Sequence, residues 1–257
     1  MSIEKLSSSV NGESTKPTIV LVHGAFEDAS IWWGVIERLQ PKGYKLVAFG
    51  NPCQGVAVDA AYLRSLLGKI EGPIVLAAHS YGGAVITQAG DDPKVKALVY
   101  AGSILPAIGE SSTNSVSRFP GSSFFTSVEQ TDYSLPDGTS GSYLLYQVDK
   151  FHAETSADVP ADRAALMAVT QRPMHAAALN EPLTLAAWMS KPSWQVRTLD
   201  DVGIPPATQK FEGDRAKSHA TEVYSSHSVT VSHPDIVADV IEQAVLSVHE
   251  PDERCGL

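Results

Sequence analysis

The chain has 257 residues, of which 43% are hydrophobic, and a formal net charge of −10 at pH 7. The length fits one α/β domain with an insertion, and the hydrophobic content excludes intrinsic disorder for most of the chain. The acidic balance argues against nucleic acid or an anionic membrane surface as a partner.

The N-terminal residues 1–16 are polar and rich in serine, with no apolar stretch that could act as a signal peptide. No run approaches the roughly 20 apolar residues that cross a bilayer. We therefore expect a flexible N-terminal segment and a cytoplasmic protein that does not engage a membrane. The two cysteines, Cys53 and Cys255, give no disulfide framework, and no Cys or His spacing suggests a metal site.

Strand and helix patterns alternate from residue 18 onward, which predicts a mostly parallel central sheet with helices on both faces. The expected strands lie at residues 18–22, 44–49, 74–77, 95–101 and 194–198. The expected helices lie at residues 31–40, with Ser30 as N-cap, at 58–70, from Gly82 onward, and in the amphipathic stretch from Pro234.

The most informative motif is Ala-His-Ser-Tyr-Gly-Gly at residues 78–83, directly after an apolar strand. One common α/β fold class raises a nucleophilic serine on such a strand-to-helix turn, flanked by small residues because the helix passes close to the strand. The usual pattern is Gly-x-Ser-x-Gly, and Ala78 replaces its first glycine. Serine and glycine also cluster in ordinary turns, but the flanking strand and helix favour Ser80 as a nucleophile. We interpret His79 as a packing residue.

A second turn, His-Gly-Ala-Phe at residues 23–26, follows the first strand. Backbone N–H groups in such a turn can point into a pocket and hold a developing oxyanion. The predicted oxyanion donors are the N–H groups of Ala25 and of Tyr81, the residue after the nucleophile. We interpret His23 as a residue that orients this turn.

Candidates for a base and its carboxylate come later in the chain, each after a predicted strand. A serine hydroxyl needs a base within reach, and a neutral imidazole suits this role when a carboxylate fixes its tautomer. His227 and His233 are the candidates for the base, and Asp200 and Asp201 for the carboxylate. Adjacent residues that leave a strand point in different directions, so only one aspartate can serve. Position by itself leaves both choices open.

Between residues 103 and 191 the alternation of strands and helices breaks down. A Pro-Asp-Gly turn lies between strand-like segments, and an alanine-rich helix is expected at residues 161–170. Loops this long are usually functional, so we interpret the segment as a cap that supplies substrate-binding walls. Predicted substrate contacts are Phe26, Phe124, Phe125 and Trp188. The expected core consists of residues 17–102 and 192–249, and the expected cap of residues 103–191. Residues 1–16 are expected to form a flexible N-terminal segment, and residues 250–257 a C-terminal tail.

These motifs, in this order, resemble the α/β-hydrolase family. The pattern is close to that of the compact plant methylesterase and hydroxynitrile lyase group and its bacterial relatives, and it covers about residues 17–249. The order Ser, Asp, His is that of α/β-hydrolases. The family spacing selects Asp201, three residues before Ile204, and His227, seven residues before Pro234. The resemblance implies an α/β-hydrolase fold with a cap insertion.

The resemblance also implies a serine esterase. Such an enzyme would cleave a carboxylic ester or lactone of a small to medium hydrophobic substrate through an acyl-enzyme, without metal or cofactor. One alternative is a cofactor-free lyase of the hydroxynitrile lyase type, but those enzymes carry threonine where this chain has Gly24 and lysine where it has Ser228. Another alternative is a ligand receptor on the same scaffold. The expected partner is a small-molecule ester, and the chain could form a homodimer.

Overall fold

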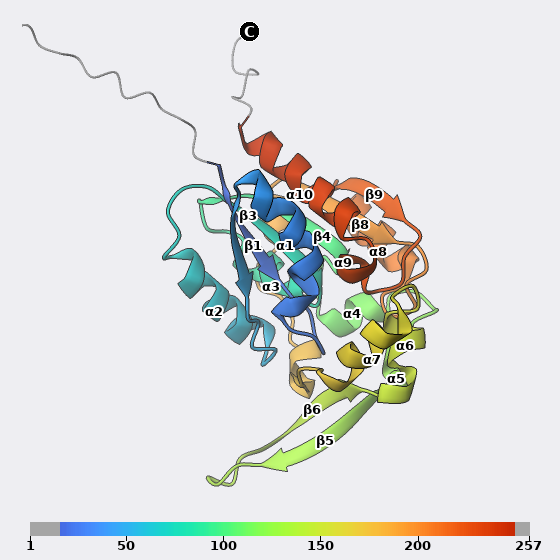
Figure 1. The fold of residues 1–257 in the computed structure, drawn as a ribbon. Coiled ribbons are helices and arrows are strands. Elements are labelled where there is room, and N and C mark those ends of the chain that lie inside the picture. Colours follow the sequence, from blue (N-terminus) through green and yellow to red (C-terminus); the bar gives the residue numbers. More distant parts are fainter. Residues whose placement is uncertain (1–15, 250–257) are drawn as a thin grey trace, which may run out of the picture.

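The computed structural model of the protein describes residues 16–249. The predicted N-terminal segment, apart from Lys16, and the predicted tail at 250–257 lie outside these residues. Six parallel strands form the main sheet in the order β2-β1-β3-β4-β8-β9 (Figure 1). Their bounds are β1 Thr18–Val22, β2 Lys45–Phe49, β3 Ile74–Ser80, β4 Val95–Ser103, β8 Ser193–Thr198 and β9 His219–Val223. The predicted fold class, a parallel sheet of the α/β-hydrolase type, is confirmed.

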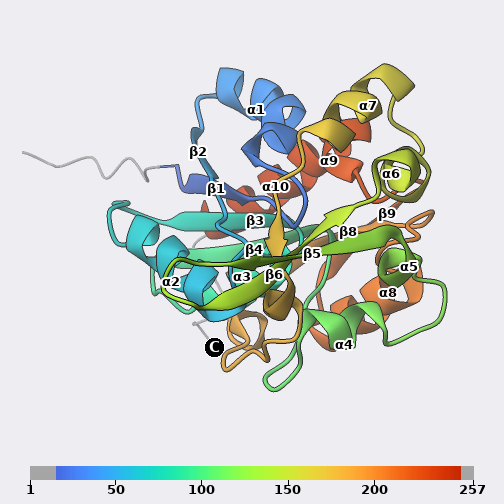
Figure 2. The same ribbon diagram turned by 90° about the horizontal axis from the view of Figure 1, so that it is seen from below.

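Helices cover both faces of this sheet, as Figure 2 shows. On one face α1 (Trp33–Leu39) packs against α10 (Pro234–His249), next to the short α9 (Val229–Ser232). On the other face α2 (Val56–Leu67) packs against α3 (Gly82–Ala89), and α8 (Pro206–Arg215) contacts β8.

The side chains of β3 point alternately to the two faces of the sheet and contribute to a hydrophobic core on each face. Ile74, Leu76 and Ala78 point to the core under α2 and α3, whereas Val75 and Ala77 point to the core under α1 and α10. Successive side chains of a strand face opposite sides of a sheet. A central strand with helices on both sides is therefore apolar at nearly every position.

Only the first helix differs clearly from its predicted start. Residues 31–40 do not form one helix with Ser30 as its N-cap. A 3₁₀ helix, η1 (Ala29–Trp32), precedes α1, and a second one, η2 (Gln40–Lys42), follows it. The N-cap is Asp28, whose Oδ1 accepts a hydrogen bond from the Ser30 backbone N–H at 2.7 Å. Serine and aspartate are both good caps, and the sequence alone does not decide between neighbours.

The chain leaves the main sheet between β4 and β8. This excursion contains a second, antiparallel sheet in the order β5-β6-β7, with four α-helices and two 3₁₀ helices around it (Figures 1 and 2). The bounds are α4 Ser112–Val116, α5 Phe124–Ser127, β5 Val128–Ser134, β6 Ser140–Tyr146, α6 Val148–Thr155, α7 Ala161–Val169, β7 Met174–His175, η3 Ala176–Leu179 and η4 Ala187–Met189. The excursion lies at the end of the main sheet that is formed by the carboxyl ends of its parallel strands (Figure 1).

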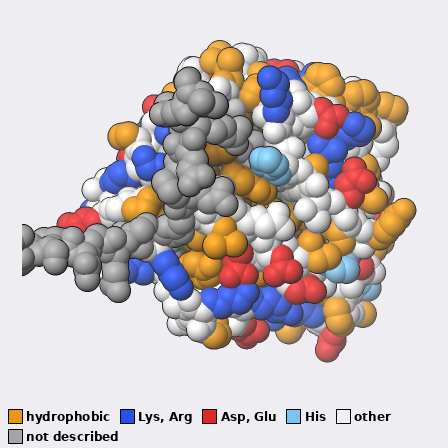
Figure 3. Space-filling view, turned by 90° about the horizontal axis from the view of Figure 1, so that it is seen from above, with side chains coloured by type: hydrophobic (Ala, Val, Ile, Leu, Met, Phe, Trp, Pro, Cys, Tyr) orange, Lys and Arg blue, Asp and Glu red, His pale blue; other side chains and the backbone are white. Residues whose placement is uncertain are grey.

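The opposite end of the molecule is seen in Figure 3, where Lys and Arg side chains lie next to Asp and Glu side chains. Lys42, which ends η2, forms an ion pair with Glu242 of α10. Among the helices of residues 16–249, none has the length and apolar character needed to span a membrane.

Close packing behind Ser80 gives a test of the fold. A Cβ on Gly83 would lie 2.1 Å from the Ser103 Oγ and 2.2 Å from the Ile104 carbonyl oxygen, and this backbone cannot move away easily. We expect Gly83→Ala to lower the free energy of unfolding by about 1–3 kcal/mol, as overpacking typically does. Gly50→Ala is the matched control, because a Cβ there meets no atom within 4 Å. Urea denaturation of both variants measures the difference, and equal stabilities would contradict the close packing.

Candidate active site

Ser80 ends β3 in a left-handed backbone conformation, with φ +53°. A non-glycine residue in this region is strained and persists only where its surroundings hold it. The turn is held because the Ser103 Oγ donates a hydrogen bond to the Ser80 carbonyl oxygen at 2.7 Å. Gly82 is required behind the turn, since a Cβ there would lie 2.6 Å from the Val22 carbonyl oxygen. The turn thus lifts the Ser80 side chain out of the sheet.

The Ser80 hydroxyl lies 2.9 Å from the Nε2 of His227, which follows β9. The Nδ1 of His227 lies 2.8 Å from the Oδ2 of Asp201, which follows β8. Since both residues come after parallel strands, the sheet brings them to the edge where β3 ends. A hydroxyl, an imidazole and a carboxylate connected in this order can activate the hydroxyl as a nucleophile.

The Asp201 carboxylate is fully buried and fixed by further donors. The backbone N–H groups of Gly203 and Ile204 donate to its Oδ1, both at 2.8 Å. The side chains of Thr198 and Gln209 donate to its Oδ2 at 2.9 and 3.1 Å. These contacts fix the carboxylate, and through it the His227 ring.

The two rivals named from the sequence lie elsewhere. Asp200 is exposed, and its backbone N–H donates to the Ser225 carbonyl oxygen. His233 lies at the start of α10, where its Nε2 is 3.4 Å from Asp158. Neither side chain is hydrogen-bonded to His227 or Ser80.

The turn after β1 is held by His23, which is completely buried. Its Nε2 accepts a hydrogen bond from the Asn51 backbone N–H, so its Nδ1 carries the proton and donates to the Gly24 carbonyl oxygen at 2.8 Å. Burial lowers the pKa of His23, which favours this neutral form. In a planar trans peptide the N–H points away from the C=O, so this bond also sets the direction of the Ala25 N–H.

The N–H groups of Ala25 and Tyr81 belong to the two turns that meet at Ser80. A Cβ on Gly24 would lie 2.5 Å from the Ser80 Cβ, so the two turns are in direct contact. Within residues 16–249, neither N–H has a protein acceptor. Two such N–H groups beside a serine hydroxyl can bind a negatively charged oxygen.

His79 is not the simple packing residue that the sequence suggested. Its Nδ1 lies 2.6 Å from the Glu27 Oε1, and its Nε2 donates to the His227 carbonyl oxygen at 2.8 Å. Glu27 received no role from the sequence, although it follows the His-Gly turn by three residues. The presence of a carboxylate so near the predicted oxyanion turn could have pointed to a role for Glu27.

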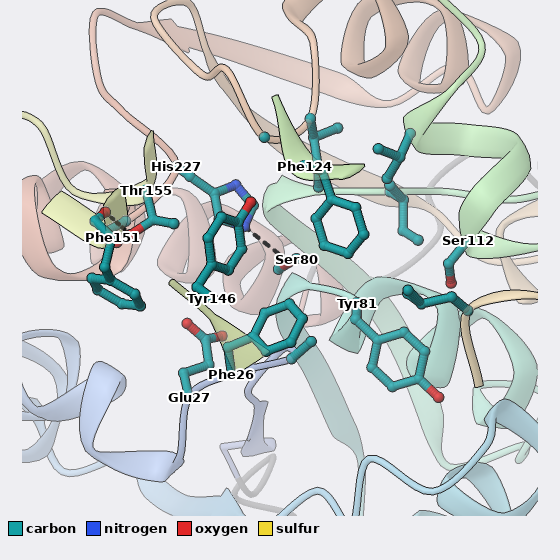
Figure 4. A pocket seen from close by; sticks show the side chains of 17 residues that line it. Phe26, Glu27, Ser80, Tyr81, Ser112, Phe124, Tyr146, Phe151, Thr155 and His227 are labelled. Atoms are coloured by element: carbon teal, nitrogen blue, oxygen red, sulfur yellow. Dashed lines mark hydrogen bonds between the residues drawn. The ribbon is translucent and has the colours of Figure 1, made fainter. Parts of the chain in front are cut away.

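A pocket opens above Ser80 and encloses about 610 Å³, part of it open to solvent (Figure 4). Aromatic rings line one side, with Phe26 packed edge-on against Tyr146 at 5.2 Å between ring centroids. Phe124 and Phe151 also pack edge-on against Tyr146. The other lining residues are Ala25, Glu27, Ser80, Tyr81, Ile104, Ser112, Val116, Thr155, Leu179, Gly203, Ile204, His227 and Ser228. The pocket is therefore mainly apolar, with Ser80 between the polar side chains of Thr155 on one side and Ser112 on the other (Figure 4).

Of the four predicted substrate contacts, the structure brings two to this pocket, Phe26 and Phe124. Phe125 is 50% exposed and points away, because consecutive helical residues face different directions. Trp188 is held outside the pocket by a hydrogen bond from its Nε1 to the Pro106 carbonyl oxygen and by Arg215 over its ring. The prediction that Phe125 and Trp188 line the pocket therefore does not agree with the structure. Tyr146 and Phe151 were missed, since their strand and helix carry no distinctive motif.

The excursion is hydrogen-bonded to the loop that carries Asp201 and to the loop that carries His227. The Ser122 Oγ donates to the Gly203 carbonyl oxygen at 2.8 Å, beside Asp201. The Ser228 N–H donates to the Thr155 carbonyl oxygen at 2.9 Å, beside His227. These hydrogen bonds hold the excursion, which forms a wall of the pocket, in a fixed position relative to Asp201 and His227.

No metal-binding group emerges from the part of the chain that the structure describes: no cluster of three or more His, Cys, Asp or Glu residues could hold an ion. Cys53 is buried, and burial raises the pKa of its thiol, which makes it a poor nucleophile or ligand.

The fold and this site define a hydrolytic enzyme of the parallel α/β class, with a serine at the strand-to-helix turn. The sequence matches the α/β-hydrolase family over residues 19–240, and the chain belongs to that family. The resemblance stated from the motifs is thus confirmed.

Individual relatives agree with this assignment. A probable hydrolase of Phoma sp. is 25% identical over 251 residues, covering 89% of this chain and 98% of that protein. Polyneuridine aldehyde esterase has a similar structure, with a TM-score of 0.77 at 18% identity, covering 92% of this chain and 100% of that one. A pyrethroid hydrolase from Sphingobium faniae has a TM-score of 0.73 at 18% identity, covering 91% and 98%. Family and relatives together support an ester hydrolase.

Proposed function

We propose that this protein is a serine esterase that cleaves a carboxylic ester or lactone of a small to medium hydrophobic substrate. The observation that carries the proposal is the hydrogen-bonded series Ser80–His227–Asp201 at the floor of an apolar pocket. Esterases and hydrolases among the structural neighbours add support. Since Gly24 is in contact with Ser80, a threonine there would collide with it, and no observation favours the lyase alternative.

Acylation begins when His227 Nε2 takes the proton of the Ser80 hydroxyl and the Oγ attacks the ester carbonyl carbon. The carbonyl oxygen becomes an oxyanion, which the N–H groups of Ala25 and Tyr81 stabilise. Removing one such donor typically costs about 3 kcal/mol of transition-state stabilisation. Asp201 holds the Nδ1–H tautomer and stabilises the imidazolium. The oxyanion then collapses, and the alcohol leaves with the proton from His227.

Deacylation repeats these steps with water. His227 takes a proton from the water molecule, whose oxygen attacks the acyl carbon of the Ser80 ester. The second oxyanion binds to the same two N–H groups. Its collapse breaks the bond between the acyl carbon and the Ser80 Oγ, which takes the proton back from His227, and the carboxylic acid is released. No cofactor is needed for either half of the reaction.

The substrate class follows from the pocket walls. Phe26, Phe124, Tyr146 and Phe151 provide apolar and aromatic surface, so the substrate group that they contact is hydrophobic. Burial raises the pKa of Tyr146, and its hydroxyl stays protonated as a potential hydrogen-bond donor. We propose that the excursion of residues 103–191 acts as a substrate-reading cap.

Turnover of a panel of p-nitrophenyl esters and lactones by the wild-type chain tests the function. We expect hydrolysis of small to medium hydrophobic esters through an acyl-enzyme. Binding without turnover would identify a receptor instead, and absence of both would contradict the proposal.

The same panel tests the role of the cap through two neighbouring residues. Phe124→Ala should change the ratio of kcat/KM between a bulky and a small ester by about tenfold, because a buried wall of the pocket is lost. Phe125→Ala, the matched control, should stay within about twofold of wild type, since its ring lies at the surface. Equal effects of the two substitutions would contradict a cap that reads the substrate through Phe124.

A further inference from the structure

A second buried histidine lies directly behind the proposed triad. The ring centroids of His79 and His227 are 4.7 Å apart, and the side chain of His79 is only 1% exposed. Its Nε2 lies 2.8 Å from the His227 carbonyl oxygen, and its Nδ1 lies 2.6 Å from the Glu27 Oε1. Neither contact is part of the mechanism described above.

The partners of His79 determine its protonation. A carbonyl oxygen can only accept a hydrogen bond, so the Nε2 carries a proton. If the Nδ1 carried none, its lone pair would face a carboxylate oxygen at 2.6 Å, which is repulsive. A second proton therefore lies between Nδ1 and Oε1. The pair has the composition of an imidazolium and a carboxylate.

The pair of Glu27 and His79 connects three loops, each of which follows a different strand of the main sheet. Glu27 Oε1 also accepts a hydrogen bond from the Gly24 N–H at 2.5 Å, in the turn after β1. His79 directly precedes Ser80 at the end of β3, and its Nε2 binds the backbone of His227 after β9. The proposed oxyanion donor, nucleophile and base each belong to one of these loops.

We propose that Glu27 and His79 form a buried ion pair of positioning residues, which holds the oxyanion turn, the nucleophile and the base in their productive arrangement. The inference rests on the proposed esterase function for its kinetic consequences, but not for the ion pair itself. Glu27 lines the pocket, but neither residue is hydrogen-bonded to the Ser80 hydroxyl or to the His227 ring. With glutamine at position 27, His79 is neutral and carries one ring proton. If that proton is on Nε2, the amide can donate to Nδ1 only by turning its oxygen away from the Gly24 N–H. If it is on Nδ1, the His227 carbonyl oxygen loses its donor, so in either case one loop loses its connection.

Electrostatics within the site agree with this arrangement. Burial by itself would lower the pKa of His79, but the charge and hydrogen bond of Glu27, together with the His227 carbonyl oxygen and Asp201, raise that pKa. Burial would raise the pKa of Glu27, but His79, His23 and the hydrogen bond from the Gly24 N–H together lower that pKa. The remaining ionisable group beside the pair is the His227 ring.

The pH range of the pair follows from these directions. The carboxylate contributes stability above the ordinary glutamate pKa of 4.5, and this is lost as the pH falls through the lowered pKa of Glu27. The imidazolium contributes stability below the ordinary histidine pKa of 6.5, and this is lost as the pH rises through the raised pKa of His79. We expect kcat to fall on the alkaline side as His79 loses its proton.

Glu27→Gln tests the proposal, because glutamine keeps the size of the side chain and removes its charge. We expect kcat to fall about tenfold to a hundredfold with KM within about threefold, since misplacing reacting groups by an ångström can cost on the order of a hundredfold. The alkaline limb of the kcat profile should move to lower pH. Asp28→Asn is the matched control: its carboxylate is next in the chain but only caps η1, and kcat should stay within about twofold.

Nitrogen-15 NMR of the histidine side chains tests the ion pair independently of activity. At pH 7, wild-type His79 should show two protonated ring nitrogens, and Glu27→Gln should show one. A single protonated nitrogen in wild type, or an unchanged kcat in Glu27→Gln, would overturn the proposal. If the wild type hydrolyses no ester while His79 shows both protons, the proposed function fails and the ion pair stands. This measurement on wild type needs no variant to fold.

Discussion

Replacing Ser80 by alanine should abolish ester hydrolysis, with a loss in kcat of at least about 10³-fold, and leave the fold intact. The reason is that no other hydroxyl is hydrogen-bonded to the His227 Nε2, within the part of the chain that the structure describes. The loss of a triad nucleophile has effects of this size or larger in serine proteases. Alanine keeps the Cβ that contacts Gly24, and it tolerates the left-handed turn no worse than serine does.

Labelling with a fluorophosphonate probe checks the same assignment without a substrate. Wild type should react with the probe, and Ser80→Ala should not. Circular dichroism and thermal unfolding are the controls for folding. Labelling that survives the substitution would show that the nucleophile is another residue.

His227→Ala should be as severe as Ser80→Ala, and the double variant should be little worse, because triad members act as a unit. Asp201→Asn should be less severe but still large, since the analogous change in serine proteases costs about 10⁴-fold by holding the wrong imidazole tautomer. Values of kcat/KM for one good ester, measured for each variant, give the comparison.

Two neighbours in the chain are the controls. His233→Ala and Asp200→Asn should retain activity within about tenfold, because neither side chain is hydrogen-bonded to the site. An inactive His233→Ala or Asp200→Asn variant would make that half of the triad assignment wrong, although the serine esterase proposal would remain.

The sequence predicted the main sheet well because its signals are local. Five of the six strands begin within one residue of the expected position, since each is rich in apolar or β-branched residues between turn residues. The sixth, β9, reads His-Ala-Thr-Glu-Val and is largely exposed at the edge of the sheet, so hydrophobicity did not set its bounds. The predicted N-cap of the first helix was wrong by two residues, because Asp28 and Ser30 are both plausible caps.

The excursion between β4 and β8 was predicted in outline, but two of its aromatic side chains lie outside the pocket that they were expected to line. The Pro-Asp-Gly turn does join β5 to β6, and α7 begins at Ala161 as expected. Aromatic content alone does not give the direction of a ring, however. Phe124 faces the pocket while Phe125 faces solvent, and Trp188 is bound to the backbone outside it.

By itself, the sequence determined the fold class, the turn that carries Ser80, and the order of the three candidate catalytic residues. Hydrophobic periodicity and turn chemistry act between residues that are close in the chain, so they can be read in one dimension. Only the tertiary structure decided what lies between distant residues, such as the contact of His79 with Glu27, 52 positions away, and with His227, 148 positions away. The physical reason is that a buried polar group takes the partner that packing brings within hydrogen-bonding distance, and packing joins strands that the sequence keeps apart.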